Sequence, residues 1–471
     1  MKILNPFQIA LTGTLALAVA ALTLPAATRS QTAGPSNSID ANNGDGISRT
    51  MTTYRSFDQN NPFFQPLGTN GRACATCHPS NQGMMLTPDY ATQVFNATQG
   101  LDPLFAAVDG ANSPTADRST LTARQANCSM LLTKGLFRIG LPLPASAEFT
   151  LQATDDPYHY SSGSDLSCFR RPLPVTNLRF LASVMWDGRE LKAGYSLIDA
   201  LKSQIKDATL GHLQALTPPT DAQIAQIVDF ETHLYTTQIY DNIAGHLDGR
   251  GREAGPEDLF RLPFFSGIND AFGLVHNRQP FDPNVFTFYE EWLPSNSNHH
   301  GPPHNPTNPN AQQLARQSIA RGEKLFDTRQ FVISGVAGLN DVTGRKQITG
   351  TCSSCHSAPS VGSNALPLLL NTGIADGSLR TADMPLYTLR NKKTGATLQT
   401  TDPGAAMTSG KWADIGKFKV PSLRGLETQS PYMHNGFSGE LLDVLNFYDN
   451  RFSIGFSAQD KADIKAFLTT L

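Results

Sequence analysis

The stretch Gly350-Thr-Cys352-Ser-Ser-Cys355-His356 places two cysteines three positions apart, with a histidine directly after the second. This is the attachment signal for c-type haem. One helical turn presents both thiols to one edge of a porphyrin, and the residue that follows can reach the iron as an axial ligand. A second copy, Cys74-Ala-Thr-Cys77-His78, occurs earlier in the chain. The sequence therefore predicts two covalently bound haem c groups, with His78 and His356 as axial ligands.

Paired cysteines also occur in other kinds of site. A zinc site would need the two halves brought together, and a redox dithiol would use one pair alone. Neither explains the histidine after each pair. The remaining cysteines, Cys128 and Cys168, have no such histidine. In an oxidising compartment we expect a disulfide between them, with two separate buried thiols as the alternative.

The composition predicts long loops, and the N-terminal segment predicts an exported protein. Of the 471 residues only 16% are charged, while 38 Gly and 31 Pro predict ordered loops. A net charge of −3 without a basic block argues against a nucleic-acid partner. Residues 1–28 are predicted to be a signal peptide, because an apolar run from Ile9 to Leu24 precedes small residues. We therefore expect a periplasmic protein without a membrane span after signal removal. Covalent haem attachment, which takes place outside the cytoplasm in bacteria, agrees with export.

Apolar residues recur at helical spacing over much of the chain. Such patterns occur at 89–108, 119–135, 178–186, 197–216, 220–247, 312–326, 439–448 and 458–470. No strong series of strands is visible. We predict a mainly α fold with two cytochrome c-like haem domains and long irregular loops.

The predicted domain order follows the two motifs. The predicted segments are a signal peptide at 1–28, a flexible leader at 29–50, an N-terminal cytochrome c-like domain at 51–292, a linker at 293–311 and a C-terminal cytochrome c-like domain at 312–471. The linker contains three histidines close together in the sequence, His299, His300 and His304. A solvated linker is the favoured interpretation, and a metal site is the alternative.

Four further segments resemble the di-haem cytochrome c peroxidase family, which includes MauG. They are Met185-Trp-Asp-Gly-Arg189, Phe418-Lys-Val-Pro-Ser-Leu-Arg424, Ser430-Pro-Tyr-Met-His-Asn-Gly436 and Asn446-Phe-Tyr448. The resemblance covers most of the chain after residue 55. It implies that the haem of His78 is peroxidatic and that the haem of His356 transfers electrons. Trp186 would link the two haems electronically, while a buried core tryptophan is the alternative.

The resemblance also suggests the sixth ligand of the second haem. In the peroxidases it is a Met placed fourteen residues after the His of the Pro-Tyr-x-His motif; here that position is Tyr448, and MauG also carries a Tyr there. Phenolate favours higher iron oxidation states than a thioether does. Met433 and Met407 are the rival ligands, and an open or otherwise ligated sixth position is the remaining alternative.

This chain departs from the family in two features of the first haem site. The second His found in peroxidases that need reductive activation is replaced by Val94, which implies an open first haem. The distal Gln and Glu positions fall on Ser196 and Lys206. The nearby stretch from Gln204 offers His212 as distal acid/base, with Asp207 as the carboxylate alternative.

Family members also bind Ca²⁺ between the haems, through an Asn side chain and backbone carbonyls near the Pro-Tyr motif. The Asn position falls near Arg170 or Arg171 here. The resemblance therefore suggests a Ca²⁺ site, but an arginine at the Asn position argues against Ca²⁺ binding.

Together these features predict a periplasmic di-haem c-type oxidoreductase of the peroxidase/MauG type. It would reduce hydrogen peroxide with electrons from a small electron-donor protein or a protein substrate. The alternatives are a non-catalytic di-haem electron-transfer cytochrome and a di-haem oxygenase using O₂. Peroxidases of this family are often homodimers, so the resemblance also suggests a homodimer for this protein.

Overall fold

A computed structural model describes residues 36–248, 254–275, 279–294 and 309–471. The predicted signal peptide and the three linker histidines His299, His300 and His304 lie outside these ranges. The prediction of a mainly α fold is wrong, because among the described residues 33% are helical and 17% are in strands, in several sheets. The strands are short and pair with distant partners, so alternation along any one of them is a weak sequence signal.

The helices account for most of the predicted helical patterns. They are α1 Cys74–Cys77, α2 Pro88–Thr98, α3 Leu121–Asn127, α4 Ser129–Lys134, α5 Leu197–Gly211, α6 Asp221–Thr232, α7 Pro256–Leu259, α8 Ala311–Thr328, α9 Asn340–Thr343, α10 Cys352–Cys355, α11 Ala406–Ser409, α12 Leu441–Phe452 and α13 Ala458–Leu468. The predicted helix at 178–186 is wrong, since only a 3₁₀ turn at Leu178–Phe180 forms there.

The strands form one four-stranded sheet and several smaller ones. They are β1 Ser38–Asn42, β2 Gly46–Thr52, β3 Phe137–Leu141, β4 Phe149–Asp155, β5 Leu166–Arg170, β6 Leu234–Asp241, β7 Gly245–His246, β8 Phe331–Ser334, β9 Gln347–Gly350, β10 Leu369–Leu370, β11 Leu386–Asn391, β12 Thr397–Thr400 and β13 Phe418–Lys419. The sheet orders are β1-β2-β6-β7, β12-β11-β4, β3-β5, β8-β9 and β10-β13.

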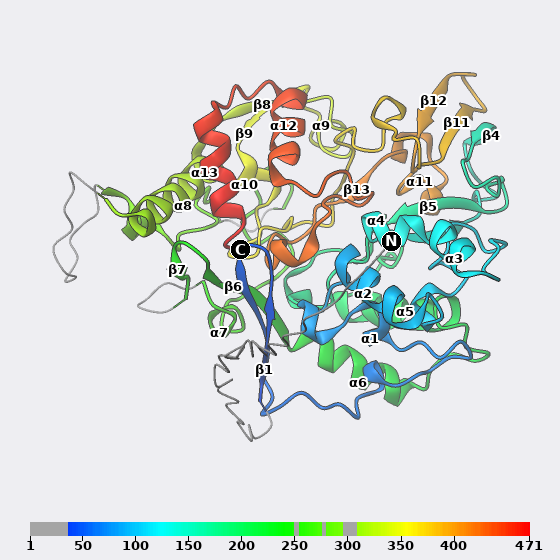
Figure 1. The fold of residues 1–471 in the computed structure, drawn as a ribbon. Helices are drawn as coiled ribbons and strands as arrows, with labels where there is room; N and C mark the ends of the chain where they lie inside the picture. Colours follow the sequence, from blue (N-terminus) through cyan, green and yellow to red (C-terminus); the bar gives the residue numbers. More distant parts are fainter. Residues whose placement is uncertain (1–35, 249–253, 276–278, 295–308) are drawn as a thin grey trace, which may run out of the picture. The chain divides into compact units, whose positions relative to one another are not determined.

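Residues 38–52 were expected to be mostly flexible leader, but they form the antiparallel hairpin β1–β2. The hairpin lies beside β6, the green strand in Figure 1, because β2 pairs with β6 from Gly46 to Thr52. Buried hydroxyls add to the pairing, with Thr50 Oγ1 and Thr236 Oγ1 at 2.8 Å. A partner that comes so much later in the sequence cannot be inferred from the leader itself.

The predicted helix over 220–247 changes into a strand after one element. Helix α6 begins at a capping box, in which the Thr220 hydroxyl accepts from Gln223 N. The helix ends at Thr232 with His233 as its C-cap, and the following run Leu-Tyr-Thr-Thr-Gln-Ile-Tyr-Asp forms the buried strand β6. Its β-branched and aromatic residues fit a strand better than a helix.

The terminal helices enclose the second motif. Helix α8 packs along α13, where Arg321 Nε donates to Asp463 Oδ2 at 2.7 Å. Phe326 and Phe467 lie in one buried cluster with residues of α12. This cluster also contacts Cys352, so the C-terminal helices support the second attachment turn.

Strand pairing joins residues on both sides of the predicted linker. Strand β4 pairs antiparallel with β11, so that Phe149 lies opposite Asn391 and Asp155 lies opposite Leu386. The division into two haem domains stays a prediction. The expected disulfide is wrong: Cys128 and Cys168 are both buried free thiols. Cys128 packs with Phe105 and Leu131, while Cys168 lies on β5 near Asp402. Among the described residues, none of the helices has the length and apolar character of a membrane span.

Candidate functional site

Each attachment motif lines its own cavity. The first cavity, about 180 Å³, is lined by Cys74, Cys77 and His78 among mostly apolar side chains. The second cavity, about 190 Å³, is lined by Cys352, Cys355 and His356 in the same way. The two motifs therefore do not combine into one site, which removes the zinc interpretation.

Both motifs fold into one helical turn by the same local contacts. The third residue of each turn carries a hydroxyl that accepts from the backbone N–H before the first cysteine. These bonds are Ala73 N to Thr76 Oγ1 at 3.0 Å and Thr351 N to Ser354 Oγ at 2.9 Å. The histidine N–H then donates to the carbonyl of the first cysteine, at 3.1 Å in both turns. The predicted helical presentation of both thiols is confirmed for α1 and α10.

The two motif histidines are held as neutral imidazoles. His78 Nδ1 donates to the carbonyl of Met84 at 3.3 Å, and His356 Nδ1 donates to that of Gly362 at 2.6 Å. Burial lowers the pKa of each to about 4. A neutral ring with its Nδ1–H tied to a carbonyl leaves Nε2 free to bind iron, which is the usual arrangement for a metal-ligating histidine. These residues therefore fit haem iron.

The thiols are not those of a redox dithiol. Burial raises the pKa of Cys77, Cys352 and Cys355 to about 12. A reactive dithiol needs a lowered thiol pKa. The motifs thus fit covalent attachment better than thiol chemistry.

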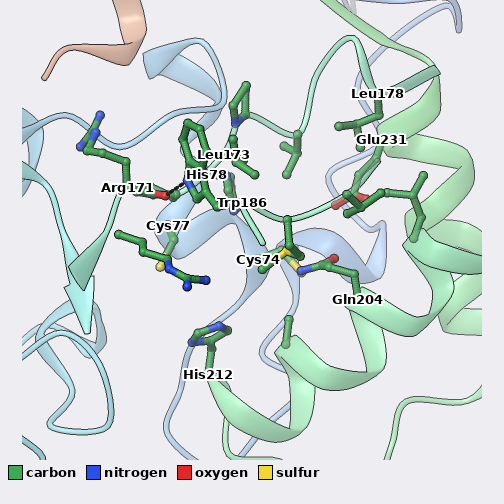
Figure 2. Close-up of a pocket in the computed structure, with 18 of the residues that line it drawn as sticks. Cys74, Cys77, His78, Arg171, Leu173, Leu178, Trp186, Gln204, His212 and Glu231 are labelled. Atoms are coloured by element: carbon green, nitrogen blue, oxygen red, sulfur yellow. Dashed lines mark hydrogen bonds between the residues drawn. The ribbon is translucent and has the colours of Figure 1, made fainter. Parts of the chain in front are cut away.

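A shared wall separates the two cavities. Its residues, which line both, are Arg171, Pro172, Leu173, Trp186, Lys419 and Pro421. Trp186 Nε1 donates to the carbonyl of Arg171 at 2.8 Å, the dashed bond in Figure 2. Its ring lies edge-on to that of His434, with centroids 6.2 Å apart. Trp186 therefore lines both cavities, which is the position that the predicted bridge would occupy.

The Asp-Gly-Arg sequence after Trp186 holds this segment in place. Asp187 is buried, and its Oδ2 accepts from Arg170 Nη1 at 2.6 Å and from Arg189 Nη1 at 3.0 Å. Burial alone would raise the pKa of Asp187, but these two guanidinium groups lower it to about 2. Gly188 has a φ of +69°, which glycine tolerates at little cost.

His212 lines the first cavity from the end of α5. Its Nδ1 lies 2.5 Å from Asp109 Oδ2, and Asp109 Oδ1 accepts from the buried Arg72. Burial favours the neutral carboxyl, but His212 and Arg72 hold the pKa of Asp109 below its ordinary value. Figure 2 shows His212 across the cavity from Trp186 and His78 in this view. The imidazole is thus oriented by a fixed carboxylate while its side chain stays 35% exposed.

Sequence reasoning missed two polar residues of the first cavity. Gln204 comes from the same face of α5 as His212, and Glu231 comes from α6. Glu231 is only 4% exposed, and burial raises its pKa to about 8. A carboxyl in the middle of an apolar helical stripe was the available signal. In contrast, Asp207 is exposed on α5 and does not line the cavity.

The second cavity contains two of the three predicted sixth ligands. Tyr448, on α12, and Met433 both line it. Burial raises the pKa of the Tyr448 phenol well above its ordinary value. Met407 packs instead in a cluster with Phe149 and Tyr387, away from the cavity lining. The structure therefore leaves Tyr448 and Met433 as candidates and removes Met407.

Comparisons with known proteins point to one class. The chain is 33% identical over 135 residues to the cytochrome-c peroxidase IdrP2 of Denitromonas iodatirespirans, a match covering 26% of this chain and 36% of that protein. It is 41% identical over 69 residues to the cytochrome-c peroxidase IdrP1 of Pseudomonas sp. (strain SCT), covering 12% of this chain and 18% of that protein. The chain thus matches only about a third or less of these relatives' length. No protein-family model matches.

Among solved structures, the chain is similar to a MauG-like protein associated with microbial copper homeostasis, with a TM-score of 0.34 and 15% identity. That match covers 78% of this chain and 87% of the other. Over the part of the chain that they match, the curated relatives support a haem c oxidoreductase of the peroxidase type, in agreement with the attachment motifs. These partial matches to cytochrome-c peroxidases support the resemblance to the di-haem cytochrome c peroxidase/MauG family seen in its sequence.

Proposed function

We propose that this protein is a periplasmic di-haem peroxidase that reduces hydrogen peroxide to water with two electrons and two protons. The observation that carries this proposal is the pair of separate motif-lined cavities with Trp186 in the wall between them. An electron carrier needs haems close together, but it does not need an oriented acid/base in one cavity. His212 and its Asp109 partner supply that feature.

Cys74 and Cys77 would hold one haem by thioether bonds, with His78 Nε2 on the iron. Cys352, Cys355 and His356 would hold the other. When bound, haem iron supplies the site for peroxide and stores oxidising equivalents. The chain's own residues exclude water through apolar cavity walls and fix the histidines through Met84 and Gly362.

His212 is proposed to move the peroxide proton in the first cavity. Its Nδ1 faces the Asp109 carboxylate, so Nε2 is the atom left to accept the proton and return it to the departing oxygen. Asp109 stabilises the protonated ring, and Arg72 keeps Asp109 ionised. Glu231, kept protonated at neutral pH by burial, is a second proton source within the same cavity.

A non-catalytic electron carrier is the second candidate. Met185 and His212 both line the first cavity, and either side chain has an atom that binds haem iron. A first haem capped in that way would carry electrons without reacting with peroxide.

The test is peroxide consumption by the haem-loaded protein, supplied with a reduced small cytochrome. One high-spin and one low-spin haem in the oxidised spectrum, with turnover, is the expected result. His212→Gln should lower kcat/KM by about 10²-fold or more, the usual contribution of a positioned acid/base. Lys202→Gln, exposed on the same helix, should leave the rate unchanged. Two low-spin haems that do not react with hydrogen peroxide would contradict the proposal and favour the electron carrier.

The remaining proposals concern the setting of the reaction. Electrons would come from a small redox protein or a protein substrate, as expected for this family. The signal-like start of the sequence supports a periplasmic location, and the family resemblance supports a homodimer. Sizing the purified protein by light scattering tests the latter directly.

A further inference from the structure

One arginine in the wall between the cavities is buried without a carboxylate partner. Arg171 is 3% exposed, and among the described residues no acidic side chain lies within ion-pair distance of it. Burial lowers its pKa to about 9, so it remains a cation at neutral pH. The neighbouring Arg170, in contrast, binds both Asp187 and Asp402. An unpaired buried charge is costly unless other polar groups surround it.

Main-chain carbonyl oxygens surround the Arg171 guanidinium. Nη1 donates to Gly135 O at 2.9 Å and to Lys134 O at 3.5 Å. Nη2 donates to Ser430 O at 3.1 Å and to Gln429 O at 3.3 Å. Four carbonyls from two distant segments thus point at one positive charge. Carbonyl oxygens without a carboxylate are also ligands that Ca²⁺ accepts in proteins.

The surrounding backbone is shaped for the guanidinium. Gly135 has a φ of +61°, and a Cβ added there would lie 1.8 Å from Arg171 Nη1. A side chain at position 135 would therefore occupy the space of the cation. Two hydrogen bonds of the Arg171 main chain link this residue to Trp186 in the shared wall and to His434 in the second cavity. Arg171 O accepts from Trp186 Nε1, and Arg171 N donates to His434 O at 2.7 Å.

We propose that the Arg171 guanidinium is a built-in cation that fills a carbonyl site otherwise suited to Ca²⁺, and that it positions Trp186 between the cavities without any metal ion. The Ca²⁺ suggested by the family resemblance does not fit here, because the arginine side chain occupies the carbonyl cage. Arg171 is a positioning residue, since it acts through Trp186 and the segment at Gln429–Ser430. The proposal does not depend on peroxide being the substrate.

The first test uses the wild-type haem-loaded protein. Calorimetric titration with CaCl₂ should give no binding heat, and EGTA should leave the thermal midpoint and the haem spectra unchanged. Binding of Ca²⁺ together with a midpoint lowered by EGTA would overturn the proposal.

The second test removes the cation. Arg171→Ala leaves four carbonyls facing an empty space, so its midpoint in EGTA should fall. Millimolar CaCl₂ should raise that midpoint again, because a ligand that binds only the folded state stabilises it by mass action. The paramagnetic resonance signals of the haems should shift in EGTA and return with Ca²⁺, which a purely structural defect would not produce. A folded Arg171→Ala protein that ignores Ca²⁺ would overturn the proposal.

Two further variants control the experiment. Arg171→Lys keeps a positive charge among the carbonyls, so it should behave like the wild type toward Ca²⁺ and EGTA even if Arg171→Ala does not fold. A Ca²⁺-dependent Arg171→Lys would count against the proposal. Arg179→Ala removes a half-buried arginine that donates to the carbonyls of Phe260 and Leu262. That variant should lose stability without gaining any response to Ca²⁺.

Discussion

Tyr448 and Met433 would give the second haem different chemistry from the same cavity. The Tyr448 side chain is partly buried and burial raises the pKa of its phenol, so it stays neutral unless a cation such as ferric iron lies next to it. A phenolate ligand would then stabilise the oxidised iron, whereas the Met433 thioether would stabilise the reduced form. The identity of this one side chain would therefore be one determinant of the potential of a haem bound in the second cavity.

Tyr448→Phe tests the ligand directly. The change removes one oxygen and keeps the ring that stacks on Phe452, so folding should be little affected. The low-spin signal of the second haem should be lost or shifted in the oxidised spectrum. Met407→Leu, which changes a side chain outside the cavity, is the control and should leave both haem signals in place. An unchanged spectrum in Tyr448→Phe would move the assignment to Met433.

At the residue scale, local chemistry was predictable and distant contacts were not. The motif cysteines and histidines follow from spacing alone, because a single helical turn brings both thiols and the histidine to one edge of a porphyrin. Trp186 and Tyr448 followed only from a family resemblance. Arg171 and Glu231 were missed, since their roles depend on groups far away in the sequence, such as the Ser430 carbonyl and the first cavity.

At the scale of elements, helices with strong periodicity were predicted well and strands were not. Helix α8 carries a complete signal within its own sequence, from the Asn310 cap to the buried Phe326. Strand β2 pairs with β6, whose residues lie almost two hundred positions later. Pairing of that kind leaves little trace in either segment.

The packing of α8 on α13 gives a prediction for whole elements. A Cβ added at Gly322 would lie 1.9 Å from the Asp463 carbonyl oxygen, so the helices approach most closely there. Gly322→Ala should therefore destabilise the protein by about 1–3 kcal/mol, although alanine favours helices. The thermal or urea midpoint measures this effect. In Gly211→Ala, where nothing lies within 4 Å, the same exchange should be neutral or stabilising. Equal midpoints for the two variants would contradict the close approach.

At the scale of the whole molecule, three buried carboxyls and a fourth one, Asp187, have opposite effects on the pH dependence of stability. Burial raises the pKa of Glu323 to about 7 and that of Glu231 and Asp327 to about 8. The Asp187 carboxylate has a pKa of about 2, because Arg170 and Arg189 overcome the effect of its burial. The first group binds protons more tightly in the folded state than in the unfolded state, and Asp187 binds them less tightly.

The sign of each effect fixes the pH of maximum stability. A raised carboxyl contributes stability below its unfolded pKa of about 4, and this is lost as the pH rises toward about 7–8. The Asp187 contribution is present above about pH 4 and is lost as the pH falls toward about 2. We expect the free energy of unfolding to peak near about pH 4–5 and to decline above it. Each raised group contributes up to about 1.4 kcal/mol per pH unit of decline.

Urea unfolding of the haem-loaded protein from about pH 4 to about pH 8 measures this profile. Glu323→Gln removes one of the titrating groups while keeping an acceptor for Phe288 N or Tyr289 N, so it should flatten the decline. Glu440→Gln, at an exposed position, should leave the slope as it is. A wild-type stability that rose steadily toward pH 8 would mean that these buried carboxyls ionise freely. The apolar surroundings that also exclude water from the two cavities would then be far more polar than the packing implies.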